Sequence, residues 1–121
     1  MELTPQAPAG RQLIERYGPT GFRVNGAIFA GPVLVFPDHT ILWEAPMPTE
    51  EGLSPVIAAG GIDLILLGLG RRGAPVKSTL RAALKAHGIG IEAMDTGAAC
   101  RTYNVLMTES RLVAAALLPP V

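Results

Sequence analysis

The residues with the clearest potential for chemistry are the glycines at positions 68–73, which read Gly-Leu-Gly-Arg-Arg-Gly. They follow the apolar run 62–67, as in a dinucleotide-binding fingerprint, where bare backbone lets a phosphate approach helix N–H groups. Glu92 follows about 20 residues later, where a ribose-binding acid would lie. Ala74-Pro75 delays the next helix, however, and the chain has no room for a second mononucleotide-binding half. We therefore predict turn glycines, no NAD or FAD binding and no cofactor, and keep small-molecule or anion (nucleotide or phosphate) binding at Gly68–Gly73 as the alternative function.

A regional charge imbalance marks a second candidate site. Between Leu64 and Ile91 there is no acidic residue, whereas the segment from Asp38 to Asp63 holds five acids and no Lys or Arg. Two interpretations stay open: an ordinary solvated helix face, or a patch that meets an acidic partner or an anion. No aromatic residue interleaves with the bases, so we expect no nucleic-acid partner. The bases of this candidate patch are Arg71, Arg72, Lys77, Arg81 and Lys85, the last three spaced to line one helix face.

Cys100 is the candidate nucleophile. It lies near the start of an expected helix and beside Arg101, and both features lower the pKa of a thiol. A nucleophile needs a base, and only His39, in a turn, and His87, at a helix end, are present. The interpretation we favour is a buried, unreactive packing residue. The two histidines and scattered carboxylates show no metal-ligand spacing, so we predict no catalytic residue and no metal site.

The elements that must position these residues form a βαβ unit. The unbroken apolar run 62–67 is typical of a strand buried on both faces. Pro75 favours the start of a helix that Gly88 ends, and residues 89–94 are expected to be a second central strand, adjacent to the first and parallel to it. Thr96 is the expected cap of a helix over 97–108, with Asp95-Thr96 together reading as a helix cap. Residues 111–118 are predicted to form a final strand.

The first third of the chain is expected to be a β-meander. Residues 1–20 are rich in Pro, Gln and Gly and are predicted to be a loose N-terminal arm, with residues 13–17 as a candidate short docked piece, which leaves 21–121 as a single α/β domain. Ser54-Pro55 resembles a cap followed by Pro at the first position of a short helix. The predicted strands cover 22–25, two pieces of 27–36 divided at Gly31-Pro32, and 40–44.

Composition limits the class of protein. A chain of 121 residues with 49% hydrophobic and only 17% charged residues has either a large core or apolar surface kept for a partner. One cysteine excludes an intrachain disulfide and fits a reducing compartment. The N-terminus lacks the basic start and apolar segment of a signal peptide, and no apolar run is long enough to span a membrane. We expect a cytoplasmic protein.

The most distinctive block is Met94-Asp95-Thr96-Gly97-Ala98-Ala99-Cys100-Arg101-Thr102-Tyr103-Asn104. With the later run 109–117 and the strand and turn at 66–70, it resembles a family of small domains of poorly defined function. This family includes mitochondrial complex I assembly factor 3 and the adipogenesis-associated domain protein. The resemblance covers about residues 22–118. The residues that carry it are Asp95, Thr96, Cys100, Arg101, Tyr103 and Asn104.

The resemblance implies a fold and a role. It implies an α/β fold: a single three-layer domain in which a mixed β-sheet is packed with helices, with an extra β-layer that we assign to the N-terminal meander. It implies no enzymatic activity and no cofactor. For the mitochondrial members it implies help in assembling a respiratory membrane complex through protein contacts. We therefore predict a non-enzymatic protein-interaction domain whose partner is a respiratory-complex subunit or another assembly factor, with a homo-oligomer left open.

Overall fold

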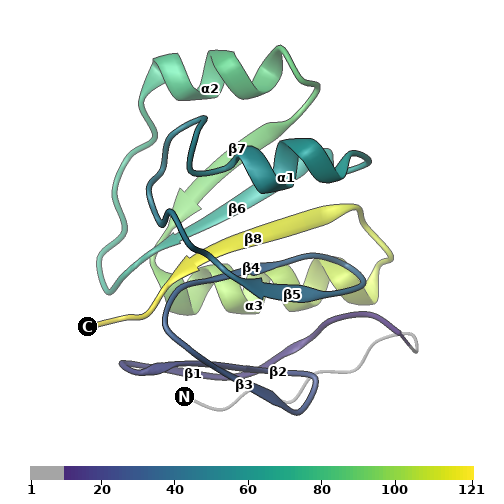
Figure 1. Ribbon diagram of the computed structural model, residues 1–121, viewed down its shortest axis with the longest axis vertical. Coiled ribbons are helices and arrows are strands. Elements are labelled where there is room, and N and C mark those ends of the chain that lie inside the picture. The colour runs from purple at the N-terminus through teal and green to yellow at the C-terminus, as the bar shows by residue number, and fades with distance from the viewer. Residues whose placement is uncertain (1–9) are drawn as a thin grey trace.

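A five-stranded mixed sheet forms the centre of the molecule, with strand order β5-β4-β8-β6-β7 (Figure 1). The computed structural model describes residues 10–121. The three strands β8, β6 and β7 run parallel, and β4 and β5 complete the sheet in antiparallel pairing. The strands are β4 (Val33–Val35), β5 (Thr40–Leu42), β6 (Leu64–Leu69), β7 (Gly90–Met94) and β8 (Val113–Leu118).

Helices cover both faces of this sheet. Helices α1 (Ser54–Ala59) and α2 (Ser78–Lys85) lie on one face, and α3 (Thr96–Thr108) lies on the other (Figure 1). The chain therefore runs β6–α2–β7 on one face and β7–α3–β8 on the other, which confirms the predicted βαβ unit and its parallel strands. Helix α2 is shorter than expected, because the backbone between Pro75 and Lys77 stays extended or irregular.

The prediction that residues 89–94 form a central strand is wrong. β7 lies at the edge of the sheet, because α3 carries the chain back across β6 and places β8 on its far side. Along β7, Gly90 and Glu92 are exposed while Ile91 is buried. Such alternation is typical of a strand with one open face, unlike the nearly continuous burial of β8.

The extra β-layer expected from the N-terminal meander is a three-stranded sheet packed on the outer side of α3 (Figure 1). Its strands are β1 (Ile14–Gly18), β2 (Gly21–Val24) and β3 (Ala27–Ala30), joined in antiparallel order. Residues 14–18 therefore form a strand of the folded domain rather than part of a loose arm, because Ile14 and Tyr17 are buried against α3, as the docked piece at 13–17 would require. The rest of that prediction, over residues 1–9, lies outside the described residues.

Two hydrophobic cores lie on opposite faces of the central sheet. One joins α3, the three-stranded sheet and alternate residues of β6 and β8 such as Leu66 and Ala115. The other joins α1, α2 and the opposite alternate residues, such as Ile65 and Ala114, around the buried Trp43. Because successive strand residues point to opposite faces, the all-apolar sequences of β6 and β8 supply both cores at once.

Two helix caps differ by one residue from the prediction. Asp95, rather than Thr96, caps α3, since its carboxylate Oδ1 accepts the Ala98 N–H at 2.9 Å. Leu53, rather than Ser54, occupies the cap position of α1, which has no side-chain cap. The reason at α3 is that the hydroxyl of Thr96 is used elsewhere, at the ends of the central strands.

Candidate functional site: the carboxyl ends of the central strands

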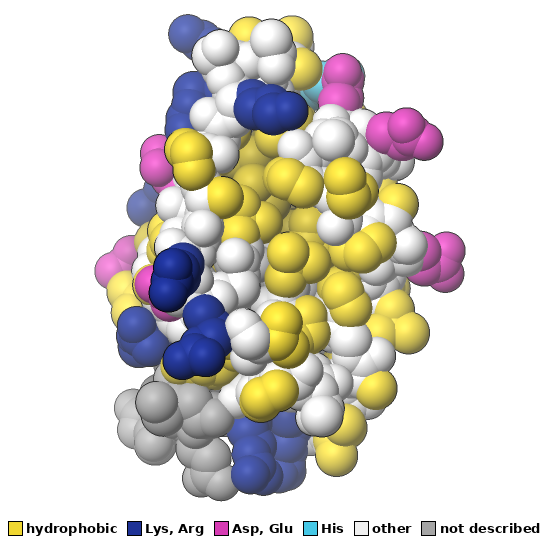
Figure 2. Space-filling view, turned by 90° about the vertical axis from the view of Figure 1, so that its left-hand side faces the viewer, with side chains coloured by type: hydrophobic (Ala, Val, Ile, Leu, Met, Phe, Trp, Pro, Cys, Tyr) yellow, Lys and Arg dark blue, Asp and Glu magenta, His cyan; other side chains and the backbone are white. Residues whose placement is uncertain are grey.

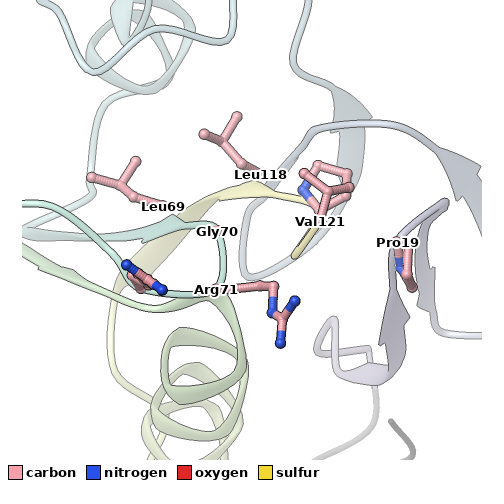
Figure 3. A pocket seen from close by; sticks show the side chains of 8 residues that line it. Pro19, Leu69, Gly70, Arg71, Leu118 and Val121 are labelled. Carbon is pink, nitrogen blue, oxygen red and sulfur yellow. The ribbon is translucent and has the colours of Figure 1, made fainter.

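A hollow on the described surface lies where β6 and β8 end. β6 leads from this end into α2 on one face of the sheet, whereas β8 is reached from α3 on the other face. The strand order therefore reverses between β6 and β8, which is where open α/β sheets form a crevice. The open hollow has a volume of about 860 Å³, and Pro19, between β1 and β2, contributes to its wall. Its lining residues are Pro19, Leu69, Gly70, Arg71, Arg72, Leu118, Pro119 and Val121, and we call it the switch-point pocket (Figure 3).

The switch-point pocket combines apolar walls with two guanidinium groups. Leu69 and Leu118 are partly buried, and the side chain of Val121 is 82% exposed. In Figure 3 these three apolar side chains lie along one side, and Arg71 extends into the open space opposite. Within residues 10–121, neither Arg71 nor Arg72 forms an ion pair. The pocket can therefore receive an apolar group and an anionic group side by side.

Thr96 holds the two strand ends that form this pocket. Its backbone N–H donates to the carbonyl of Gly70 at 2.8 Å, and its hydroxyl accepts the Gly70 N–H at 2.9 Å. The same hydroxyl donates to the carbonyl of Leu118 at 2.6 Å. Thr96 is completely buried, so the start of α3 joins the end of β6 to the end of β8.

Gly70 and Gly73 of the fingerprint serve turns, as predicted, whereas Gly68 serves packing inside β6. Gly68 lies inside β6, where a Cβ would come within 2.7 Å of Leu117 Cδ2 and 3.1 Å of Thr96 Cα. Gly70 and Gly73 have positive φ angles of 85° and 71°, which favour glycine. The N–H of Gly70 is already donated to Thr96, and α2 begins only at Ser78. No helix N-terminus therefore follows these glycines directly, and the geometry does not favour a phosphate cradle at Gly68–Gly73.

The structure divides the five candidate bases into groups. Arg71 and Arg72 line the switch-point pocket, whereas Lys77 and Lys85 lie exposed at the two ends of α2. Arg81 has a structural contact: its guanidinium donates to the Ile91 carbonyl at 2.7 Å and lies 4.0 Å from a Glu92 oxygen. Since β7 is an edge strand, Arg81 covers a backbone acceptor that another strand could otherwise use.

The distinctive block 95–104 fastens α3 to its neighbours. Asn104 is 8% exposed, and its side-chain amide accepts the Ile14 N–H at 2.9 Å and donates to the Ile14 carbonyl at 2.8 Å. Arg101 donates to the hydroxyl of Tyr17 at 3.3 Å. Tyr103 is completely buried in the core between α3 and the three-stranded sheet. Together with the contacts of Thr96, these bonds indicate that Thr96, Arg101 and Asn104 position layers of the fold, whereas the buried hydroxyl of Tyr103 has no hydrogen-bond partner among residues 10–121.

Cys100 is completely buried in the same core. Burial raises the pKa of its thiol to about 12, which outweighs the lowering effect of neighbouring Arg101. The histidines lie on the surface: His39 contacts Asp38 at 2.7 Å, and His87 contacts Glu50 at 3.4 Å. The thiol is therefore neutral at physiological pH, and the burial predicted for Cys100 is confirmed.

We predict that iodoacetamide modifies Cys100 very slowly in the native protein and quickly in denaturant, at pH 7 and also at pH 8.5. The reason is that the thiolate, which is the reactive species, forms only when the buried group is exposed. Mass spectrometry of the alkylated protein over time gives both rates. Free cysteine in the same buffer is the control, and equal rates in native and denatured protein would contradict the prediction.

No helix within residues 10–121 is both long and apolar enough to cross a membrane. The same residues contain no group of three or more His, Cys, Asp or Glu side chains placed to hold a metal ion.

The fold and the site together define a small doubly wound α/β domain with an added β-layer, whose distinctive polar residues hold its layers together. The chain belongs to the family described as "Protein of unknown function (DUF498/DUF598)", whose model matches residues 14–118. The resemblance predicted from the block at 95–104 is therefore confirmed.

Individual relatives are similar over nearly the whole chain. An uncharacterized protein of Rhodobacter capsulatus is 38% identical over 120 residues, covering 97% of this chain and 94% of that protein. The Danio rerio protein named NADH dehydrogenase (ubiquinone) 1 alpha subcomplex assembly factor 3 is 37% identical, covering 98% of this chain and 70% of that protein. A crystal structure from Bordetella parapertussis superimposes with a TM-score of 0.82 at 35% identity, covering 93% of this chain and 99% of that one.

The switch-point pocket itself did not emerge from sequence reasoning. Arg71 and Arg72 were part of the candidate patch, but the pocket's other side comes from Pro19 and from the residues after β8. A sequence signal was available in Leu118-Pro119-Pro120, where two prolines end a buried strand and leave apolar side chains at its exposed end.

Proposed function

We propose that this chain is a non-enzymatic protein-interaction domain that helps to assemble a respiratory membrane complex of the NADH dehydrogenase type. The observation that carries the proposal is the 37% identity, over 98% of this chain, to a protein named as an assembly factor for that complex. The structure supports a role without catalysis, because Asp95, Thr96 and Asn104 are occupied by hydrogen bonds that hold the fold. The proposed compartment is the cytoplasm.

The proposed partner is a protein, either a subunit of the complex or another assembly factor. The bases Arg71, Arg72, Lys77, Arg81 and Lys85 remain the proposed contact for its acidic surface. Arg81 is expected to contribute least, since it is bonded to the edge of β7. We expect neither nucleic acid nor a cofactor to take part, and pairing with a second copy of the chain is the competing arrangement.

Deletion of the gene in its native host is the direct test. We expect less assembled NADH dehydrogenase on native gels of solubilised membranes, together with lower NADH-to-quinone activity. Both are expected to recover when the wild-type chain is supplied, while the succinate dehydrogenase of the same membranes serves as the unaffected control. A normal level of assembled complex without the gene would contradict the proposal.

Charge reversal on α2 tests the basic contact. We predict that Lys77→Glu/Lys85→Glu leaves the melting temperature within a few degrees of wild type, because exposed charges contribute little to folding. The same variant is expected to slow partner association and to restore less of the assembled complex, most clearly at low ionic strength. Surface plasmon resonance against the subunit recovered with the wild-type chain gives the association rate.

The matched control carries the same change of charge elsewhere on the surface. Arg16→Glu/Arg111→Glu alters two exposed bases outside the 64–91 segment. It is expected to associate at the wild-type rate. Equal behaviour of the two variants would show that the α2 bases are merely solvated.

A further inference from the structure

We propose that the switch-point pocket is the docking site for a segment of the partner protein in which apolar side chains stand next to Asp or Glu. This inference rests on the proposed function and specifies the chemistry of the partner. The segment's apolar side chains would enter between Leu69 and Leu118, and its carboxylate would bind Arg71 or Arg72 (Figure 3).

The apolar character of this face extends beyond the pocket. Figure 2 shows hydrophobic side chains gathered across the middle of the face, with charged side chains around it: Lys and Arg are more frequent along one margin, where some Asp and Glu also lie. Val121, which lines the pocket, is 82% exposed. Contiguous apolar surface with a polar rim is characteristic of protein interfaces.

The positive charge at the rim of the pocket indicates that the partner carries negative charge there. Arg71 and Arg72 are exposed, and no carboxylate of residues 10–121 pairs with either. Since no acid lies between Leu64 and Ile91, nothing nearby in the sequence neutralises them. A guanidinium binds a carboxylate through two parallel N–H···O bonds, so an Asp or Glu of the partner is the complementary group.

The shape of the site favours a protein segment over other occupants. Small-molecule sites bury most of the ligand's surface, whereas this pocket is widely open to solvent. A bilayer would need protruding apolar side chains, but Leu69 and Leu118 are partly buried in the hollow. A partner's side chains can enter such a hollow one at a time.

The pocket is also held in place before any partner binds. The three hydrogen bonds of Thr96 to Gly70 and Leu118 fix the ends of β6 and β8 relative to each other. Binding to a preformed site avoids the entropic cost of ordering loops. The strand ends, rather than a mobile loop, therefore present the apolar side chains.

Site-specific photocrosslinking in the native host tests this inference. The full chain carries p-benzoylphenylalanine at Val121, an exposed position in the pocket, and cross-linked peptides are identified by mass spectrometry. We expect one dominant partner segment that contains apolar residues with an adjacent Asp or Glu. The same photoreactive residue at Val105, which is 55% exposed on α3, is the control and is expected not to label that segment.

Charge exchange tests the ion pair itself. Arg71→Glu/Arg72→Glu is expected to lower the yield of the cross-link about tenfold, because like charges then oppose each other across the contact. Changing the partner's labelled carboxylates to Lys is expected to restore it. A folded variant, verified by circular dichroism, that still cross-links at the wild-type level would overturn the proposal. Cross-links to lipid, to a second copy of this chain, or to a segment without acidic residues would do the same.

These outcomes separate the docking site from the proposed function. If deletion of the gene impairs the respiratory complex but Arg71→Glu/Arg72→Glu restores it fully, the function stands and this docking site is wrong. If deletion leaves the complex intact while an acidic, apolar segment of another protein is labelled and passes the charge exchange, the docking site stands and the proposed function is wrong.

Discussion

Asn104→Ala is expected to lower the free energy of unfolding by about 2–4 kcal/mol, since each buried hydrogen-bonding group left unpaired costs about 1–3 kcal/mol. The Asn104 amide satisfies both the N–H and the carbonyl of Ile14. Ile14 is completely buried, so water does not readily replace the amide. Urea unfolding followed by circular dichroism gives the free energy.

The control for this experiment lies one residue further along the same helix. Val105 is 55% exposed, and Val105→Ala is expected to change the free energy of unfolding by less than about 0.5 kcal/mol. Hydrogen exchange of β1 in Asn104→Ala should accelerate more than exchange of β6, because the lost bonds tie β1 to α3. If Asn104→Ala lowered the free energy of unfolding by less than about 0.5 kcal/mol, β1 would not depend on its hydrogen bonds to Asn104.

The C-terminal half of the fold could be predicted because its signals are local. The apolar sequences of β6 and β8 identify buried strands, and Asp95-Thr96 marks the beginning of α3. Each of these signals depends only on residues within one helix or strand and on the residues that flank it. The predicted cap of α3, Thr96, lies one residue after the actual cap, Asp95, because the hydroxyl of Thr96 bonds to strand ends distant in the sequence.

The N-terminal strand β1 could not be predicted for the opposite reason. Its segment Ile-Glu-Arg-Tyr-Gly is mostly polar, and the preceding residues are rich in Pro and Gly. What makes it a strand is pairing with β2 and the amide of Asn104, which lies 90 residues away in the chain. Information of this kind is tertiary, so composition alone suggested a loose arm.

The same distinction applies to the candidate site. Charge counting identified Arg71, Arg72 and the bases of α2, but it could not assign Arg81 to the edge of β7, because that requires knowing the strand order. The pocket likewise depends on which strands are neighbours. β6 and β8 are separated by β7 and two helices in the sequence, and only their pairing brings Leu69 and Leu118 together.

Thr96→Val is expected to lower the free energy of unfolding by about 2–4 kcal/mol, because the N–H of Gly70 and the carbonyl of Leu118 both lose a partner at a partly buried position. Valine keeps the branched shape of threonine, so no cavity forms, and the loss combines the missing hydroxyl with the crowding of a methyl group against the Leu118 carbonyl. Urea unfolding measures it. Thr96→Ser is the matched control: it keeps the hydroxyl, and the missing methyl group is expected to cost about 1 kcal/mol.

The positions at which Thr96→Val perturbs the folded structure provide a second measurement. Amide chemical shifts should change most at Gly70 and around Leu118, the two strand ends that the hydroxyl joins. Because these ends form the switch-point pocket, the folded variant should also bind its partner more weakly, while the basic face of α2 is unchanged. If Thr96→Val proved as stable as Thr96→Ser, the hydroxyl would not be what holds the pocket. The preformed geometry would then have to come from packing alone.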